Sequence, residues 1–324
     1  MNEGKFLKSL NGERGNMYVR KGGHVPSESF HAGFDELQEE ILSRSSMEAL
    51  KVKQFEIEKD EDDIRVINRA VDGVRGVLKS FGAEEAMVSS SLVHLVEPEY
   101  FNRKDGDLSG TTGGADAVSQ VVVVEKSRLA TRSKIAIVSF HELMHHASFQ
   151  RVGVVQNTEE SGAEMLAVLE RNGFNMAVKK DPQKMLFYYL TEMVVEKLTK
   201  EFVEKIRTES DFKEEFDYIE EQLAERGESR PWGGYMEVGF DDTGKEIWHL
   251  SEAYKEEVER FEGILSEMAT QNPQFASSEE VFYIFVRGLL SGRLLEIARL
   301  LEKTYGKGAF RKLGEMTART SHNE

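Results

Sequence analysis

Residues Ile135–Phe149 read IAIVSFHELMHHASF and contain the pattern H-E-x-x-H, formed by His141, Glu142 and His145. Positions i and i+4 of an α-helix lie on one face, so both imidazoles can reach the same metal ion. Histidines at this spacing bind Zn²⁺, and a glutamate beside the first can take a proton from a water that the metal activates. The sequence therefore predicts a helix over Ser133–Phe149 in which His141 and His145 hold Zn²⁺ and Glu142 is the catalytic base.

The residues around this pattern are uncharged, which is typical of a buried helix that exposes only its ligands and its base. Val138 lies three residues before the first histidine, and His146 lies off the ligand face, where a structural role is expected. The alternative interpretation is a helix whose histidines are satisfied by hydrogen bonds within the core. The uncharged positions are Ser139, Phe140, Leu143, Met144, His146 and Ala147.

Two histidines leave the predicted site one ligand short, and the sequence offers two acidic candidates. Glu192 and Glu196 are spaced i, i+4 on a helix predicted over Met185–Ile206, so one carboxylate could complete the zinc shell while the other orients a ligand histidine. The second candidate is the pair Glu160 and Glu164, which lies closer to the histidines in the sequence. We take Glu192 as the third ligand and Glu196 as its neighbour that orients a histidine; two exposed glutamates on a solvated face are the alternative.

The amino-acid composition argues against several kinds of site and partner. The chain has 324 residues and no cysteine, which excludes disulfides, thiolate zinc sites and a cysteine nucleophile. Its 42 Lys and Arg against 58 Asp and Glu give a net charge of −16, so nucleic-acid binding is not expected. No run approaches the roughly 20 apolar residues of a membrane span, and no secretory signal is visible. These features predict a cytoplasmic protein that does not enter a membrane.

The spacing of apolar residues predicts an α+β fold with a mostly helical C-terminal part. A loosely structured region is expected over residues 1–60, a catalytic domain over 61–210, and a hairpin followed by helices over 211–324. The expected elements are helices at Ile64–Phe81, Ser251–Gln271, Glu279–Leu290 and Ser291–Tyr305, strands at Val88–Val96 and Val118–Val124, a plain loop at Gly106–Gly114, hairpins within Arg151–Lys180 and Met236–Leu250, and a polar, solvent-facing segment at Asp211–Arg230.

Residues 64–202 resemble a gluzincin-type zincin domain, in which a glutamate on a later helix is the third zinc ligand. More narrowly, the chain is similar to a prokaryotic group that carries the motifs HEL[ILM]H and LNEAVTExL. The second motif corresponds here to Leu190–Leu198, with Thr191 in place of Asn and Val195 in place of Thr. Gly292–Leu313 is similar to the helical tail of that group. The resemblance implies a zincin-like metallopeptidase domain.

The resemblance also implies how a substrate would be held. The strand expected at Val118–Val124 would line the cleft, and its free edge would pair with an extended peptide. A peptidase needs a group that stabilises the oxyanion, and in gluzincins this is usually a downstream Tyr or His. Tyr235, His249 and Tyr254 are the candidates, and the sequence does not rank them.

These expectations describe a zinc-dependent peptidase that hydrolyses peptide bonds of a peptide or protein substrate, with Glu142 as general base. The alternative is a protein that keeps the zincin fold, cleaves nothing and serves as a binding or scaffold protein. An intact Glu142 argues against this alternative, because a non-catalytic zinc site does not need the base. A third interpretation is a chance occurrence of the pattern in a helical structural protein.

Overall fold

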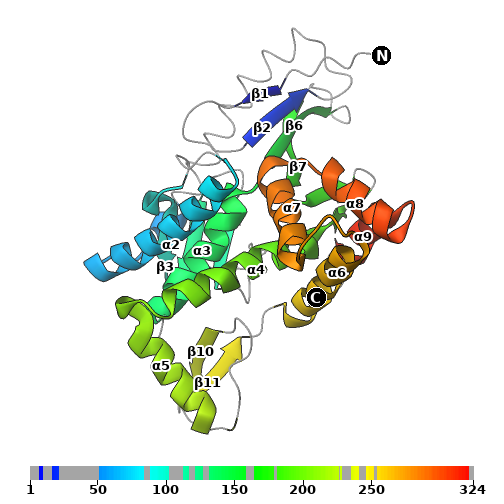
Figure 1. Ribbon diagram of the computed structural model, residues 1–324. Coiled ribbons are helices and arrows are strands. Elements are labelled where there is room, and N and C mark those ends of the chain that lie inside the picture. Colours follow the sequence, from blue (N-terminus) through cyan, green and yellow to red (C-terminus); the bar gives the residue numbers. More distant parts are fainter. Residues whose placement is uncertain are drawn as a thin grey trace.

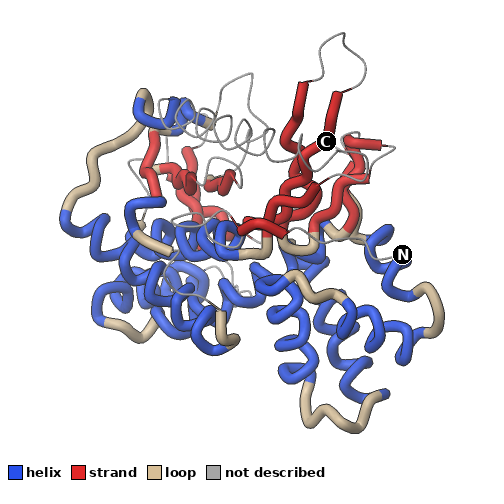
Figure 2. The backbone as a smooth tube through the Cα atoms, turned by 90° about the horizontal axis from the view of Figure 1, so that it is seen from above, coloured by secondary structure: helices blue, strands red, loops and turns tan. Residues whose placement is uncertain are grey.

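Both helices and strands occur along the chain, so the predicted α+β class is confirmed. The structure, a computed structural model, describes residues 7–9, 17–21, 51–83, 88–101, 112–116, 121–126, 131–157, 164–178, 181–225, 227, 235–240, 246–251 and 254–320. Figure 1 labels the elements, and Figure 2 shows most of the helices along one side of the strands.

Two packed helices form the framework around the H-E-x-x-H residues. Helix α2 (Glu61–Ser80) begins with a reciprocal cap in which the side chains of Asp60 and Asp63 each accept a hydrogen bond from the other residue's amide, at 2.8 and 3.1 Å. Its buried face packs against helix α3 (Arg132–Ala147), which carries the H-E-x-x-H residues. The helices predicted in these two regions are confirmed, with small shifts of their ends.

A small sheet lies against α3 and has the strand order β3 (Val93–Val96), β5 (Val121–Glu125), β4 (Gly113–Asp116). Strand β3 runs parallel to β5, and β4 runs antiparallel to it. The strand predicted over Val88–Val96 is therefore shorter than expected. Its first half contains a 3₁₀ turn at Ser90–Leu92.

Strand β4 corrects two predictions. Gly113 and Gly114 were expected in a plain loop, but they pair with Val124 and Val123 of β5. Glycine has low strand propensity, so this strand is fixed by its partner rather than by its own sequence. The valine-rich strand expected to line the cleft with a free edge is β5, which has a neighbour on each side. The edges of this sheet, as far as the structure describes it, are β3 and β4.

A larger sheet contains the hairpin expected within Arg151–Lys180. Its order is β1-β2-β6-β7-β8-β9-β12, in which β2 and β6 are parallel and the other neighbours are antiparallel. The sheet joins segments that are far apart in the sequence. Its strands are β1 (Leu7–Ser9), β2 (Met17–Lys21), β6 (Gln150–Asn157), β7 (Glu164–Asn172), β8 (Asn175–Val178), β9 (Asp181–Leu186) and β12 (Arg319–Thr320).

Helix α4 (Tyr188–Ile206) follows β9 directly, and it begins later than predicted because Met185 and Leu186 belong to β9. Helix α5 (Ser210–Glu225) occupies the segment expected to face solvent. One side of α5 is nevertheless apolar and buried, which corrects that expectation. The buried residues of α5 are Phe212, Phe216, Ile219 and Leu223.

The remainder of the chain is a hairpin followed by helices, as predicted. Strands β10 (Tyr235–Phe240) and β11 (Glu246–Ser251) pair antiparallel, and the residues of their turn lie outside the described part. None of the described helices is long and apolar enough to cross a bilayer. The C-terminal helices are α6 (Lys255–Gln271), α7 (Ser278–Ser291), α8 (Leu295–Tyr305) and α9 (Ala309–Met316).

Candidate metal centre

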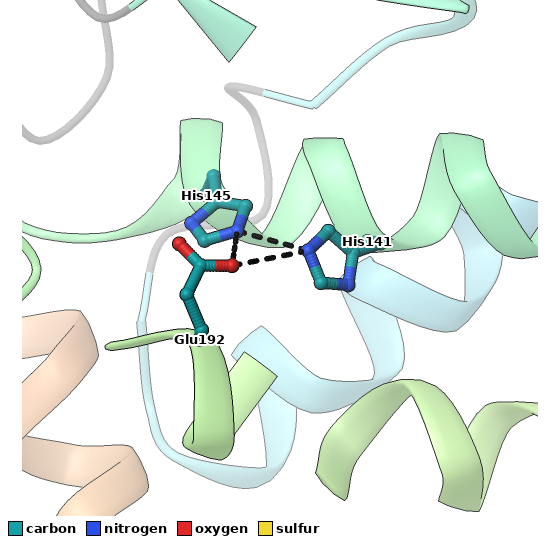
Figure 3. Close-up of side chains that lie close together, drawn as sticks. All are labelled: His141, His145 and Glu192. Atoms are coloured by element: carbon teal, nitrogen blue, oxygen red, sulfur yellow. Dashed lines mark hydrogen bonds and ion pairs between the residues drawn. The ribbon is translucent and has the colours of Figure 1, made fainter. Parts of the chain in front are cut away.

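Helices α3 and α4 bring together the three residues predicted to hold a metal. The ligand atoms of His141, His145 and Glu192 all lie within 4.8 Å of one another. The two Nε2 atoms are 3.1 Å apart, and Glu192 Oε2 lies 3.6 Å from Nε2 of His141 and 3.3 Å from Nε2 of His145. Figure 3 shows both imidazoles projecting from α3 toward the carboxylate on α4.

The spacing of these atoms fits a tetrahedral zinc ion. With bonds of roughly 2.0–2.1 Å, a tetrahedral ion separates its ligand atoms by roughly 3.3–3.4 Å. The separations of 3.1, 3.3 and 3.6 Å lie around that value. Two imidazoles and one carboxylate are also the donor set of known catalytic zinc sites, which keep a fourth position for water or substrate. The residues present therefore fit Zn²⁺.

An aromatic stack fixes the two ligand-bearing helices against each other. The rings of Phe140 on α3 and Phe202 on α4 lie 4.3 Å apart with an angle of 5° between their planes. Gly73 of α2 makes room for the stack, because a Cβ atom there would lie 2.7 Å from the Phe202 ring and 3.1 Å from the Phe140 ring. Since Phe140 directly precedes His141, this contact holds α3 against α4 next to the first histidine.

A second pair of acceptors faces the other nitrogen of His141. Its Nδ1 lies 3.4 Å from Glu196 Oε2 and 3.4 Å from Thr199 Oγ1. The Thr199 hydroxyl donates to the Val195 carbonyl at 2.9 Å, so it is available to His141 as an acceptor. Two acceptors at Nδ1 favour the tautomer that carries its proton there, which leaves the Nε2 lone pair for a metal. Glu196 thus lies where the sequence predicted, and Thr199 was not foreseen.

Opposite charges shift the pKa values of Glu192 and His141 in the metal-free site. Burial raises the pKa of Glu192, but the two nearby imidazoles outweigh it and hold the pKa well below its usual range. Burial lowers the pKa of His141, whereas its bonds to Glu192 and Glu196 raise it, with a net rise. Both effects follow from opposite charges at short range in a site where water screens them little.

Thr191, one of the two departures from the motif named in the sequence analysis, bonds to the turn between β7 and β8. Its hydroxyl accepts a hydrogen bond from the Phe174 amide at 3.2 Å and donates to Asn175 Oδ1 at 2.6 Å. Thr191 therefore ties the turn between β7 and β8 to α4, beside Glu192. The other departure, Val195, is fully buried in the core.

The predicted base, Glu142, lies between the histidines and the edge strand β4. A Cβ atom on Gly113 would lie 3.0 Å from Cγ and Oε1 of Glu142 and 2.5 Å from Val138 Cγ1. Burial raises the pKa of Glu142, the imidazoles of His141 and His145 oppose this, and the charge of Glu192 adds to the rise; the net effect is a raised pKa. A raised carboxylate pKa is typical of general bases.

Of the three oxyanion candidates, the structure describes the side chain of Tyr254 and places it near the site. Burial raises the pKa of Tyr254, and the charge of Glu192, a hydrogen bond with Tyr188 and the charge of Glu142 raise it further. The phenol is therefore neutral, and the charges of both carboxylates contribute to its raised pKa. The side chains of Tyr235 and His249 lie outside the described part. Tyr188 was missed, although its i, i+4 spacing to Glu192 was visible in the sequence.

The alternative acidic pair falls on side chains that the structure does not describe. Glu164 is the first residue of strand β7, not part of a helix, and its side chain lies outside the described part. Glu160 lies outside the described residues altogether.

Comparisons of the chain with protein-family models, with curated proteins and with solved structures each found no match.

Proposed function

We propose that this protein is a zinc-dependent peptidase of gluzincin type, in which His141, His145 and Glu192 hold the metal and Glu142 is the general base. The observation that carries the proposal is the convergence of three ligand atoms from α3 and α4 within 4.8 Å, with a carboxylate at their side. A bound Zn²⁺ supplies Lewis acidity to polarise a peptide carbonyl and to lower the pKa of a water.

Glu142 performs the proton transfers in this proposal. Its carboxylate accepts a proton from the attacking water and later delivers it to the nitrogen of the leaving amine. The raised pKa of Glu142 suits both steps, because a base whose pKa is closer to neutrality can also return the proton. Position supports the role as well, since Glu142 is next in sequence to His141 and faces β4.

The edge strand β4 and Tyr254 would hold the substrate. Within the described residues, the side of β4 away from β5 has no strand beside it, so an extended peptide can pair there by strand addition. Such a peptide would cross the molecule beside Glu142, because Gly113 of β4 approaches that side chain. The neutral phenol of Tyr254 would donate a hydrogen bond to the oxygen of the carbonyl under attack.

The test replaces the base and leaves the metal ligands in place. Glu142→Gln is nearly isosteric, so we expect it to fold, to bind Zn²⁺ and to lose about 10²–10⁴-fold in cleavage rate. The matched control is Glu204→Gln on α4, an exposed glutamate whose partner is Arg207. Zinc content is measured by elemental analysis, and cleavage by mass spectrometry of a digested peptide library.

Undiminished cleavage by Glu142→Gln would rule out the mechanism. A wild-type protein that binds one zinc but cleaves no peptide of the library would instead favour a binding or scaffold protein. A wild-type protein that takes up no zinc would refute the metal centre itself.

A further inference from the structure

The first turn of α4, which leads to Glu192, is held by the C-terminal segment 309–320. The amide of Phe187 donates to the Gly314 carbonyl at 3.2 Å, and the amide of Tyr189 donates to the Thr317 carbonyl at 2.9 Å. The first amides of a helix have no partner within it and need acceptors from elsewhere. No side chain caps α4, so these two carbonyls serve the start of the helix.

The same segment packs tightly against the residue before α4. Phe187 adopts a left-handed backbone conformation with φ of 60°, which is uncommon for a bulky side chain. Its ring lies so close to Gly314 that a Cβ atom there would be 2.5 Å from Phe187 Cζ. Phe310 adds a ring contact at 4.8 Å. The unusual conformation at the start of α4 is thus sustained by contacts with α9.

Arg319 extends this contact toward the metal ligands. It lies in β12, where it pairs with Met185 of β9, and its Nη1 donates to the Tyr188 hydroxyl at 3.2 Å. Its guanidinium also lies 5.1 Å from the centre of the Tyr188 ring. Tyr188 and Glu192 are spaced i, i+4, so they occupy the same face of α4. Arg319 therefore contacts the side chain of Tyr188, which lies one helical turn before Glu192.

We propose that Arg319 is a positioning residue of the metal centre: by holding Tyr188, it sets the start of α4 so that the Glu192 carboxylate stays within reach of both imidazoles. This inference rests on the proposed function, since it concerns the same metal. Groups outside the ligand shell that orient metal ligands typically change metal affinity by about 10–100-fold when removed.

Four single variants of the full chain, and the double variant of Arg319→Gln with Tyr188→Phe, test the proposal. Arg319→Gln removes the charged guanidinium group, Arg319→Lys keeps a positive charge, and Tyr188→Phe removes the hydroxyl that accepts the hydrogen bond. Arg311→Gln is the control, because Arg311 belongs to the same segment but forms an exposed ion pair with Glu315. Zinc affinity is measured by competition with a chelator, and the visible spectrum of the Co²⁺-loaded protein reports the geometry of the ligands.

We expect Arg319→Gln and Tyr188→Phe each to weaken zinc binding about 10–100-fold and to change the Co²⁺ spectrum. The loss in the double variant should be smaller than the sum of the two single losses, because both variants remove the hydrogen bond between Arg319 and Tyr188, although Tyr188→Phe also removes the hydrogen bond with Tyr254. Arg319→Lys should recover part of the affinity, and Arg311→Gln should match the wild type. In the metal-free protein, the Tyr189 amide should exchange its hydrogen faster in Arg319→Gln than in the control.

Three results would overturn the inference. In the first, Arg319→Gln keeps wild-type zinc affinity and Co²⁺ spectrum while the wild type still binds zinc and cleaves; Arg319 then has no role at the site and the proposed function stands. In the second, Arg319→Gln lowers thermal stability without changing zinc affinity, which shows a structural role alone. In the third, the wild type binds no zinc, and the proposed function falls together with this inference.

Discussion

Gly113 of β4 lies directly over Glu142 of α3, so close that a Cβ atom at position 113 would be 3.0 Å from the Glu142 carboxylate. Gly113→Ala should therefore push the edge strand or the base out of place. We expect a loss of about 1–3 kcal/mol in the free energy of unfolding and a lower kcat/KM for peptide hydrolysis, measured by denaturant titration and by steady-state kinetics.

The control for this prediction is Gly76→Ala. Gly76 lies on α2, and a Cβ atom there would have no side chain or neighbouring segment within 4 Å. Alanine at this position should stabilise the helix by roughly 0.5–1 kcal/mol. A Gly113→Ala protein with unchanged stability and unchanged kcat/KM would contradict the close approach.

Removing the carboxylate beside Nδ1 of His141 should weaken metal binding without abolishing it. Glu196→Gln keeps the shape of the side chain but removes the charge that lies 3.4 Å from Nδ1. We expect zinc affinity to fall about 10–100-fold, and Glu192→Gln, which alters a direct ligand, to cost more. Isothermal titration calorimetry ranks the two. Equal affinities for Glu196→Gln and the wild type would show that Glu196 does not orient His141.

Chelation of the metal should lower stability but leave the protein folded. The Phe140–Phe202 stack joins α3 to α4 through apolar contact, which does not depend on a metal. Zinc at 100 times its dissociation constant should add about 2.7 kcal/mol, and Phe202→Ala should cost about 3–5 kcal/mol with or without zinc. Circular dichroism during thermal unfolding measures both. A chelated protein with no helical signal would show that the helices need the metal.

Stability should rise with pH above the pKa of Lys200. Burial lowers the pKa of this lysine to about 8, against the opposing charges of Glu262 and Glu196. The unfolded chain has the ordinary lysine pKa of about 10.4. Between these values the unfolded state binds the proton and the folded state does not, so the free energy of unfolding increases with pH in that window.

Lys200→Met should remove this increase between about pH 8 and 10. The control is Lys213→Met, because Lys213 is exposed and pairs with Asp217 on the same helix. Urea titrations at several pH values compare the slopes of the variants. A slope for Lys200→Met equal to that of the wild type would show that another group titrates.

Local patterns predicted the elements, and the i, i+4 spacing predicted which side chains share a face. Periodicity was sufficient for α2 and α3, and the spacing of His141 and His145 placed both imidazoles on one side of a helix. The choice of Glu192 over Glu160 also came from local sequence, because only the former lay on a clearly amphipathic segment.

What the sequence did not reveal depends on contacts between distant segments. Strand β4 consists of Gly-Gly-Ala-Asp, which has no preference for a strand, and it forms one because β5 lies beside it. The role of Arg319 could not be predicted either, since it is separated from Tyr188 by 131 positions and no local pattern links them. Thr199 looked like an ordinary helical residue until its distance to His141 was known.

The carbonyls of Gly314 and Thr317 at the start of α4 limit how the molecule can be shortened. A fragment of residues 61–210 would contain both histidines, the base and the acidic ligand, yet its α4 would begin with two unsatisfied amides and an unsupported Phe187. Such an excised piece would bind metal more weakly than the intact chain. Transplanting the centre into another scaffold would accordingly require a substitute for the last described helix and strand.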